Sequence, residues 1–254
     1  IDRRRGAASW SWGGRGGVPG SARVGGKGAQ MAAVPPLLDA AAMARFERDG
    51  FAVVTLPLTD QELQAASEAW DRNTEPIDDD PGYTALISHP SVEAIAKQVL
   101  RAERVFIMSA FRAERPGAEP GTPPPTGPAN GGFHTDVQVT AGDWEATPRR
   151  AHLAIWIWID DVTPSRAAIR MLPGSHRTLG AHWEAALAKH RNGESLPRPR
   201  SGQHGPFAGD LDQTDFPVSA DFPVSARRGQ ALVFTPSLVS TAACNRVFSL
   251  GCLN

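Results

Sequence analysis

The residues best suited to chemistry in this chain are a histidine and an aspartate that stand two positions apart, His134 and Asp136. Side chains two positions apart on an extended strand project from the same face, so this pair can bind one metal ion. An imidazole beside a carboxylate suits Fe(II) or another first-row divalent ion, and two protein ligands leave coordination positions open. The same pattern also suits a strand end where both side chains hydrogen-bond nearby backbone. The sequence thus predicts a candidate metal site whose remaining ligands come from elsewhere.

The clearest strand that could position this site runs from His152 to Asp160. Its alternation places two apolar rows on opposite sides, so both faces are predicted to be buried, as in a sandwich or barrel. The first row is Leu153, Ile155, Ile157 and Ile159, and the second is Ala154, Trp156 and Trp158. Trp156 is a candidate for lining a cavity, and a tryptophan of an ordinary core is the alternative.

Helical spacing and capping signals predict further elements around this strand. The expected helices are Pro35 to Asp49, Thr59 to about Arg72, Pro90 to Ala102 and a short one at His182 to Arg191. The first ends at a left-handed Gly50, and the second opens on a Thr59-x-x-Glu62 capping box. The expected strands are Phe51 to Leu56, read as buried, then Arg104 to Ala113, Ala168 to Leu172, and lastly Gly229 to Thr235.

Two long segments rich in Pro and Gly interrupt this pattern, Arg115 to Gly132 and Gly193 to Asp212. The first precedes His134 directly, and it reads either as a mobile lid or as simple disorder. A tandem copy of the hexapeptide Asp-Phe-Pro-Val-Ser-Ala occupies Asp215 to Ala220 and Asp221 to Ala226. A repeat this short is no solenoid unit and indicates a duplicated loop.

Composition predicts one main folded domain and argues against nucleic acid and membrane as binding partners. Residues 1–30 hold six Arg and Lys residues against one Asp and are rich in Gly, so we expect a disordered leader, a non-native segment or a transit peptide, followed by the folded domain at 31–254. A net charge of -1 gives no electrostatic case for nucleic acid, and no apolar run is long enough for a membrane span. Cys244 and Cys252 both lie close to the C-terminus and cannot staple the fold as the disulfides of a secreted protein would, which favours an intracellular protein, cytoplasmic or organellar.

A series of motifs then resembles the phytanoyl-CoA dioxygenase family of Fe(II)- and 2-oxoglutarate-dependent oxygenases. The motifs are Phe46-x-x-Asp49-Gly50-Phe51, His134-Thr135-Asp136, the segment from Trp156 to Pro164, the segment from Arg170 to Arg177, and the strand from Gly229 to Phe234. Their order and spacing agree with the family from about Leu38 to Phe234.

The resemblance implies a mainly β fold: a double-stranded β-helix, which is a jelly-roll or cupin-like barrel, with flanking N-terminal α-helices. It implies that His134 and Asp136 are catalytic metal ligands on Fe(II), with 2-oxoglutarate as cosubstrate and molecular oxygen as oxidant. Trp156 falls where the family places an aromatic residue beside the cosubstrate. The implied activity is a dioxygenase that hydroxylates a small organic or lipid-like substrate. His176 belongs to a motif typical of the family but is not expected to be a ligand.

The chain departs from the family pattern near its C-terminus. Ser240 stands where the family has its third ligand, a histidine, and the family's arginine for 2-oxoglutarate falls in the region Leu250-Gly251-Cys252. From this we expect the last barrel strand to be missing. Cys244 and His204 are substitute ligands to consider. A neutral serine is a poor ligand for Fe(II), so two alternatives stay open: an inactive barrel that binds a ligand, and a cupin-like module that holds another divalent metal.

Overall fold

The computed structural model describes residues 36–72, 79–113, 135, 146, 151–163, 169–195, 222–238, 240 and 247–253. The chain divides into two units, Ile1–Ala33 and Val34–Asn254, and all described residues belong to the second. The expected leader, the segment Arg115 to Gly132 and the first hexapeptide copy lie outside the described residues. No helix in the described part is long and apolar enough to cross a membrane.

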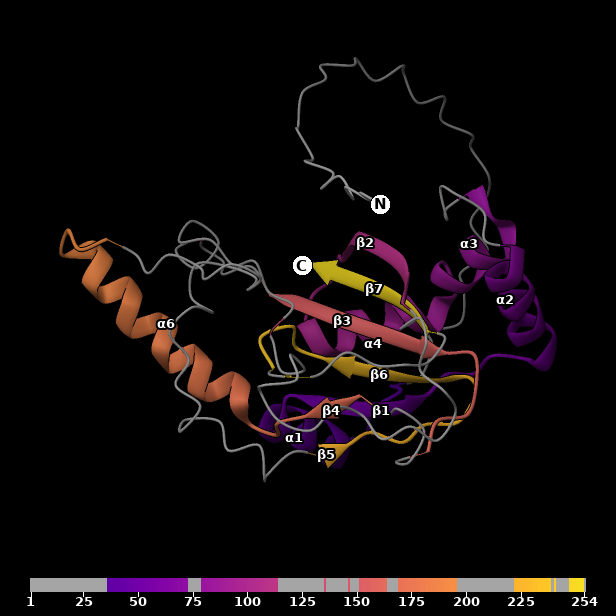
Figure 1. Cartoon of the computed structure of the whole chain (residues 1–254), viewed down its shortest axis with the longest axis horizontal. Helices are drawn as coiled ribbons and strands as arrows, with labels where there is room; N and C mark the ends of the chain where they lie inside the picture. Colours follow the sequence, from indigo (N-terminus) through magenta and orange to yellow (C-terminus); the bar gives the residue numbers. More distant parts are fainter. Residues whose placement is uncertain are drawn as a thin grey trace, which may run out of the picture. The chain divides into compact units, whose positions relative to one another are not determined.

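The described chain forms helices and two antiparallel sheets (Figure 1). The large sheet has the strand order β1-β6-β3-β7-β2, and β4 pairs with β5 in the small one. The strands are β1 Phe51–Thr55, β2 Phe106–Ala113, β3 His152–Trp158, β4 Arg170–Met171, β5 Phe222–Pro223, β6 Gln230–Phe234 and β7 Val247–Leu253. The helices are α1 Ala40–Asp49, α2 Asp60–Arg72, α3 Pro81–Ile87, α4 Pro90–Leu100 and α6 Ser175–Arg191.

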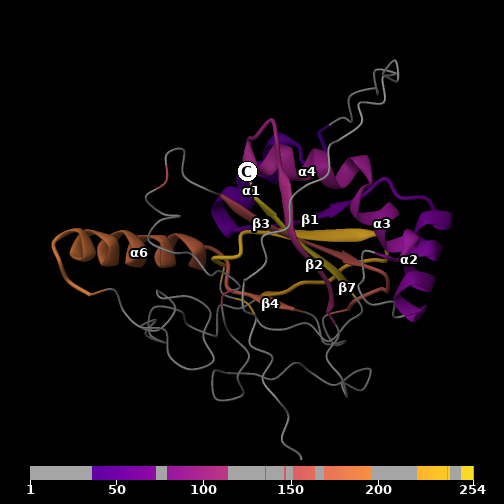
Figure 2. The same cartoon turned by 90° about the horizontal axis from the view of Figure 1, so that it is seen from above.

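The two faces of the large sheet bury two separate hydrophobic clusters. The helix-side cluster joins Leu153, Ile155, Ile157 and Ile159 to residues of α2, α3 and α4, including Ala66, Tyr83 and Ile95. The inner cluster joins Ala154, Trp156 and Trp158 to the small sheet and nearby chain, including Val162, Ile169, Met171, Val224, Ala226, Leu232, Phe234 and Leu238. Figure 2 shows α4 on one side of the large sheet and β4 on the other. Both faces of β3 are therefore buried, as the alternation predicted.

The predicted caps of the first two helices are confirmed. The Thr59 amide donates to the Glu62 carboxylate at 2.7 Å and the Glu62 amide donates to Thr59 Oγ1 at 3.2 Å, which is the reciprocal capping box of α2. Gly50 ends α1 at φ 87°, and its N–H donates to the Phe46 carbonyl at 2.7 Å. α1 starts at Ala40, later than predicted, because Asp39 caps it by accepting from the Ala42 amide at 2.7 Å.

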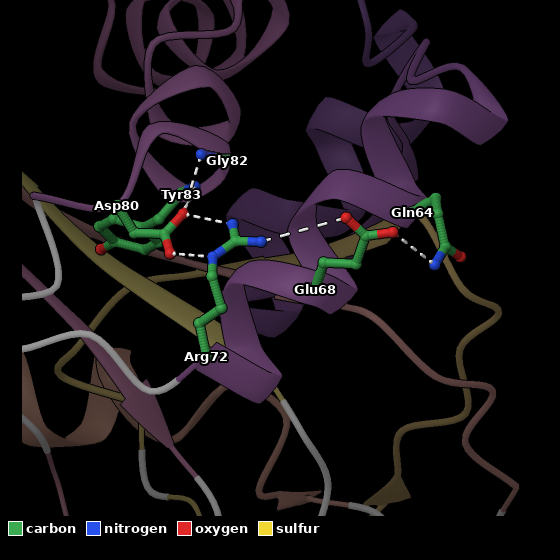
Figure 3. Close-up of polar contacts among 6 residues, drawn as sticks. All are labelled: Gln64, Glu68, Arg72, Asp80, Gly82 and Tyr83. Atoms are coloured by element: carbon green, nitrogen blue, oxygen red, sulfur yellow. Dashed lines mark hydrogen bonds and ion pairs between the residues drawn. The ribbon is translucent and has the colours of Figure 1, made fainter.

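The helix α3 was not predicted, and a single carboxylate fixes where it begins. Asp80 accepts from the Gly82 amide at 2.9 Å and the Tyr83 amide at 3.4 Å, and Pro81 occupies the first turn, where a missing N–H costs nothing. The guanidinium of Arg72 at the end of α2 donates to both Asp80 oxygens at 2.7 and 2.8 Å (Figure 3). This pairing ties α2 to α3 and holds the pKa of the buried Asp80 carboxyl well below its usual range.

Three other expectations are corrected. β1 is an edge strand of the described sheet rather than a fully buried one, because among the described strands it pairs with β6 alone and it exposes Val53 and Thr55. Gly229 to Thr235 is not the last strand, because Val247–Leu253 hydrogen-bonds to β3 on one side and to β2 on the other. The helix expected at His182 to Arg191 begins earlier, at Ser175, so His176 lies in its first turn.

Candidate functional site

The inner cluster is the candidate site, because the predicted cosubstrate residue Trp156 lies in it. Trp156 is 8% exposed, and its ring meets Phe234 of β6 edge-on, with centroids 5.5 Å apart and an interplanar angle of 87°. Its Cα partners in the sheet are Leu232 in β6 and Ser249 in β7, so the backbone of Trp156 is held from both sides of β3. An aromatic pair in this geometry makes a rigid apolar wall. The contact of Trp156 with 2-oxoglutarate stays a prediction.

The two predicted metal ligands, His134 and Asp136, lie outside the described residues. Thr135, which separates them, is described and is 2% exposed. Its Oγ1 is buried and has no hydrogen-bond partner among the described residues. The chain is therefore buried at the centre of the predicted His-x-Asp motif. A buried hydroxyl without a partner is uncommon in native proteins, and such atoms often mark functional positions.

The predicted position of the third ligand is also buried. Ser240 is 2% exposed and forms an antiparallel bridge with Met171 of β4, a member of the inner cluster. Met171 pairs on its other side with Phe222 of β5, so Ser240 extends the small sheet beyond β4. The structure thus places Ser240 beside the inner cluster, while the substitute ligands Cys244 and His204 lie outside the described residues.

The region where the family has its arginine is part of β7. Leu250 and Cys252 belong to the helix-side cluster, so Gly251 between them is at an inner-face position, opposite Ala154 of β3. Burial raises the pKa of the Cys252 thiol to about 11, and its side faces the helices. Cys252 is therefore an inert core thiol, and Gly251 brings no side chain to the inner face.

In the described part of the chain, the inner face carries neutral polar atoms. Among the described residues, the buried polar side chains include no Lys or Arg, and no group of three His, Cys, Asp or Glu could hold a metal ion. Trp158 is fully buried, and its Nε1 has no hydrogen-bond partner in the described part of the chain. Residue types alone did not single out Thr135 or Trp158. The signal available for Trp158 was its place two positions after Trp156 on the same strand face.

The described residues also line a groove of about 280 Å³, and its lining residues include neither Trp156 nor Ser240. It lies against α1 and β1, with Arg45, Phe51, Val53 and Phe222 among its walls. The Asp49 carboxylate at this groove is already paired with Arg48 at 2.6 Å. Phe51, which lines the groove, also packs against the inner cluster, so the groove adjoins the candidate site.

The family-typical motif at His176 has a packing role in the structure. His176 is half-buried and hydrogen-bonds the Glu47 backbone at the end of α1, and burial lowers the pKa of its imidazole. A Cβ at Gly50 would lie 2.5 Å from His176 Nδ1, so this position has room only for glycine. The Gly174 amide donates to the Asp49 carbonyl at 2.9 Å, and the Thr235 amide donates to the Gly50 carbonyl at 3.0 Å. The motifs at Asp49-Gly50 and Gly174-His176 therefore meet at one junction.

Comparison with known families identifies the chain. Residues 31–247 match the family described as Phytanoyl-CoA dioxygenase (PhyH). The chain belongs to the phytanoyl-CoA dioxygenase family. This match confirms the resemblance drawn from the motifs, and it spans His134, Asp136, Trp156 and Ser240. Membership in this family supports an oxygenase-type enzyme. No curated protein sequence matches the chain.

Solved structures of similar fold agree with membership in the phytanoyl-CoA dioxygenase family. SnoK, a non-heme alpha ketoglutarate dependent carbocyclase from nogalamycin biosynthesis, has a TM-score of 0.57 at 16% identity, covering 85% of this chain and 84% of that one. EvdO2 from Micromonospora carbonacea var. aurantiaca, complexed with 2-oxoglutarate, has a TM-score of 0.53 at 16% identity, covering 85% and 91%. EctD from S. alaskensis with bound Fe has a TM-score of 0.53 at 18% identity, covering 88% and 79%. These similarities support a jelly-roll type of fold for the two sheets.

Proposed function

We propose that this protein is an Fe(II)- and 2-oxoglutarate-dependent dioxygenase that hydroxylates a small organic or lipid-like substrate. The observation that carries the proposal is the family match over residues 31–247, which includes both predicted ligands and the inner wall of β3. We further propose that the two sheets belong to a double-stranded β-helix. The face-to-face packing of the large and small sheets across the inner cluster supports this architecture.

The residues present suit the iron and the cosubstrate in part. His134 and Asp136 supply an imidazole nitrogen and a carboxylate oxygen, which are ligand types that Fe(II) prefers. Two buried atoms, Thr135 Oγ1 and Trp158 Nε1, have no hydrogen-bond partner among the described residues, which supports a polar ligand for this protein. Bound iron and 2-oxoglutarate supply the oxidising chemistry that amino-acid side chains lack.

The side chains of the inner cluster orient the reactants and exclude water. Trp156 and Phe234 form a rigid aromatic wall, and Met171 and Val224 cover it from the small sheet. Because this environment is dry, hydrogen bonds inside it are stronger than in water. Its apolar composition supports a substrate whose reacting carbon is part of a hydrocarbon segment. His134 and Asp136 would hold the metal at this wall, which is the role proposed for both.

Ser240 favours a second candidate function, a catalytically inactive barrel that binds a ligand or a metal. It is buried beside Met171, and a neutral hydroxyl holds Fe(II) less well than an imidazole. This candidate predicts ligand binding without turnover. It further predicts that Ser240→His does not produce succinate from 2-oxoglutarate.

An anaerobic titration of the full chain with Fe(II) and 2-oxoglutarate tests the dioxygenase proposal. We expect the metal-to-cosubstrate charge-transfer absorption in the wild-type protein and its loss in His134→Ala. After oxygen is admitted, succinate should form in the wild type and fall to background in the variant. Absorption without succinate supports the binding module. If neither the folded wild-type protein nor the folded Ser240→His variant shows the absorption, the proposed iron site is overturned.

A further inference from the structure

The groove against α1 and β1 gathers exposed apolar side chains. Phe51 and Val53 of β1 form part of its walls, together with Pro173 and with Phe222 of β5. Val53 is 36% exposed and Phe222 is 53% exposed, so two of the four exposed large hydrophobic residues in the described chain lie in this one groove. Large exposed apolar side chains that gather in a hollow commonly mark a binding site.

The volume of the groove limits the size of a ligand. A cavity of about 150 Å³ holds one benzene molecule, so by the same ratio this groove of about 280 Å³ accommodates about eleven non-hydrogen atoms. The rings of Phe51 and Phe222 lie 6.1 Å apart with an interplanar angle of 34°, and they provide an aromatic surface. The apolar part of a ligand that fits here is one ring or a short hydrocarbon chain.

Arg45 provides a positive charge that a ligand in this groove can use. It lies in α1 and is exposed, and no ion pair joins it to another residue in the described part of the chain. Asp49, which also lines the groove, is already neutralised, because its two oxygens accept from Arg48 Nε at 2.8 Å and from Arg48 Nη2 at 2.6 Å. The described lining therefore combines apolar walls with one unpaired positive charge.

This charge balance suits a carboxylate better than a phosphate. A guanidinium can bind either group through two parallel hydrogen bonds. A phosphate monoester has a charge of about -1.5 to -2 at pH 7, which exceeds the single charge of Arg45 and adds repulsion from the Asp49 carboxylate. A carboxylate has one negative charge, so Arg45 alone neutralises it.

We propose that this groove is a second ligand site, which binds a small carboxylate with an apolar body. The carboxylate pairs with Arg45, and the apolar body packs against Phe51, Val53 and Phe222. The site uses none of the predicted metal ligands. It therefore goes beyond the proposed dioxygenase function, and its test needs no turnover.

A second copy of the chain is the competing occupant, since β1 is an edge strand of the described sheet. In a two-fold dimer the same patch of both copies meets, so the interface would contain two Arg45 side chains. Like charges brought together at an interface weaken it, whereas a carboxylate neutralises Arg45. The charge therefore favours the small anion.

An NMR titration of the ¹⁵N-labelled full chain with 4-phenylbutyrate tests the proposal. This probe has one ring, a short carbon chain and one carboxylate, and 4-phenylbutanamide is its neutral counterpart of the same shape. The Val53 amide cross-peak, identified by its loss in Val53→Ile, should move with 4-phenylbutyrate, with a dissociation constant of about 1 mM. The acid should bind about fivefold more tightly than the amide, because an exposed ion pair contributes little more. Added salt should reduce this preference.

Three variants separate the roles of charge and wall. Arg45→Gln should abolish the preference for the acid. Arg104→Gln is the matched control, because Arg104 is also exposed but lies over the Phe106 ring and does not line the groove. This control should keep the preference. Phe222→Ala should weaken the binding of acid and amide by the same factor, since both lose the same apolar wall.

Several results would overturn the proposal. A preference that survives in Arg45→Gln removes the role of Arg45, and if this variant fails to fold, a preference that salt does not change has the same meaning. Tighter binding of phenyl phosphate than of 4-phenylbutyrate contradicts the carboxylate assignment. A still Val53 cross-peak rules out the ligand site, and a wild-type dimer that Val53→Asp dissociates would then assign the groove to a second copy. None of these results affects the dioxygenase proposal, which the Fe(II) and 2-oxoglutarate titration tests separately.

Discussion

The two faces of β3 are built on different principles. On the helix side, Leu153, Ile155 and Ile157 are fully buried against apolar side chains of α4 and its neighbours. On the inner side, Trp156 and Trp158 are buried against two short strands, and one indole donor has no partner among the described residues. In the described part of the chain, the inner side thus holds a buried indole donor without a hydrogen-bond partner, Trp158 Nε1. We infer that stability resides on the first face and ligand binding on the second.

The coverings of the two faces differ in the same way. The helix side is closed by α2, α3 and α4, whose ends are fixed by a capping box at Thr59 and by the Arg72–Asp80 pair. Among the described residues, the inner side is covered by Met171 of β4, which bridges to Ser240, and by side chains outside the named strands such as Val162 and Val224. Such a cover packs less extensively than a layer of helices and leaves room for a ligand at the inner cluster. Substitutions on either face can test this division of roles.

Truncating a residue of the helix-side row should have the largest effect on stability. Ile155→Ala should lower the free energy of unfolding by about 2–5 kcal/mol, because it leaves a cavity in a fully buried position. The affinity of the remaining folded protein for 2-oxoglutarate should not change. Urea unfolding and calorimetry measure the two quantities. Ile155→Val is the control, with an expected loss of about 0.5–1.5 kcal/mol.

Trp156→Phe should show the reverse pattern, with weaker binding of 2-oxoglutarate and a smaller loss of stability than Ile155→Ala. If both variants lose stability and affinity together, the two faces are not separate in function and the comparison fails. This outcome would also weaken the assignment of the inner cluster as the site.

The sequence was sufficient to predict the division into two faces. The strict alternation in His152 to Asp160 predicts a strand buried on both sides, because side chains of a strand point alternately to its two faces and both rows here are apolar. The capping box at Thr59 and the left-handed glycine at Gly50 are local signals, and both helix ends lie where those signals placed them. Local chemistry at these positions decides the structure.

The parts that the sequence did not predict depend on contacts between distant residues. α3 has seven residues and depends on the pairing of Asp80 with Arg72, which no local pattern shows. β7 contains Gly251 and is a strand because β2 and β3 both pair with it. For the site, His134 and Asp136 could be proposed from spacing. That no described residue pairs with the buried Trp158 donor depends on three-dimensional packing, so the sequence could not reveal it.

The junction beside β1 joins the two layers and should be the next most sensitive place. Gly50→Ala should destabilise the protein by about 2–3 kcal/mol, because alanine is strained at φ 87° and its Cβ would lie 2.5 Å from His176 Nδ1. Thermal and urea unfolding measure the loss. In a His176→Ala background the part of the loss that comes from the imidazole should disappear, while the backbone part and the contact with Leu238 Cδ1 at 2.9 Å should remain.

Gly180→Ala is the matched control for this junction. Gly180 lies within α6, and a Cβ added there would meet no atom within 4 Å, so alanine should stabilise the helix by about 0.5–1 kcal/mol. Equal losses for Gly50→Ala in the two His176 backgrounds would show that the imidazole does not restrict this site. The motifs would then be joined only by their backbone hydrogen bonds.

The smallest expected effect concerns the helix layer and its response to pH. The Arg72 guanidinium holds the pKa of Asp80 below its usual range, so the carboxylate stabilises the fold fully above its unfolded pKa of about 3.9. That stability should be lost as the pH falls below about 4, toward the folded pKa. Asp80→Asn should cost about 1–2 kcal/mol at pH 7, since the amide keeps a cap acceptor but loses the charge. Urea unfolding from pH 7 to pH 2 should show the wild-type and variant curves converging as the pH falls, and parallel curves would mean that the ion pair does not stabilise the helices of this face.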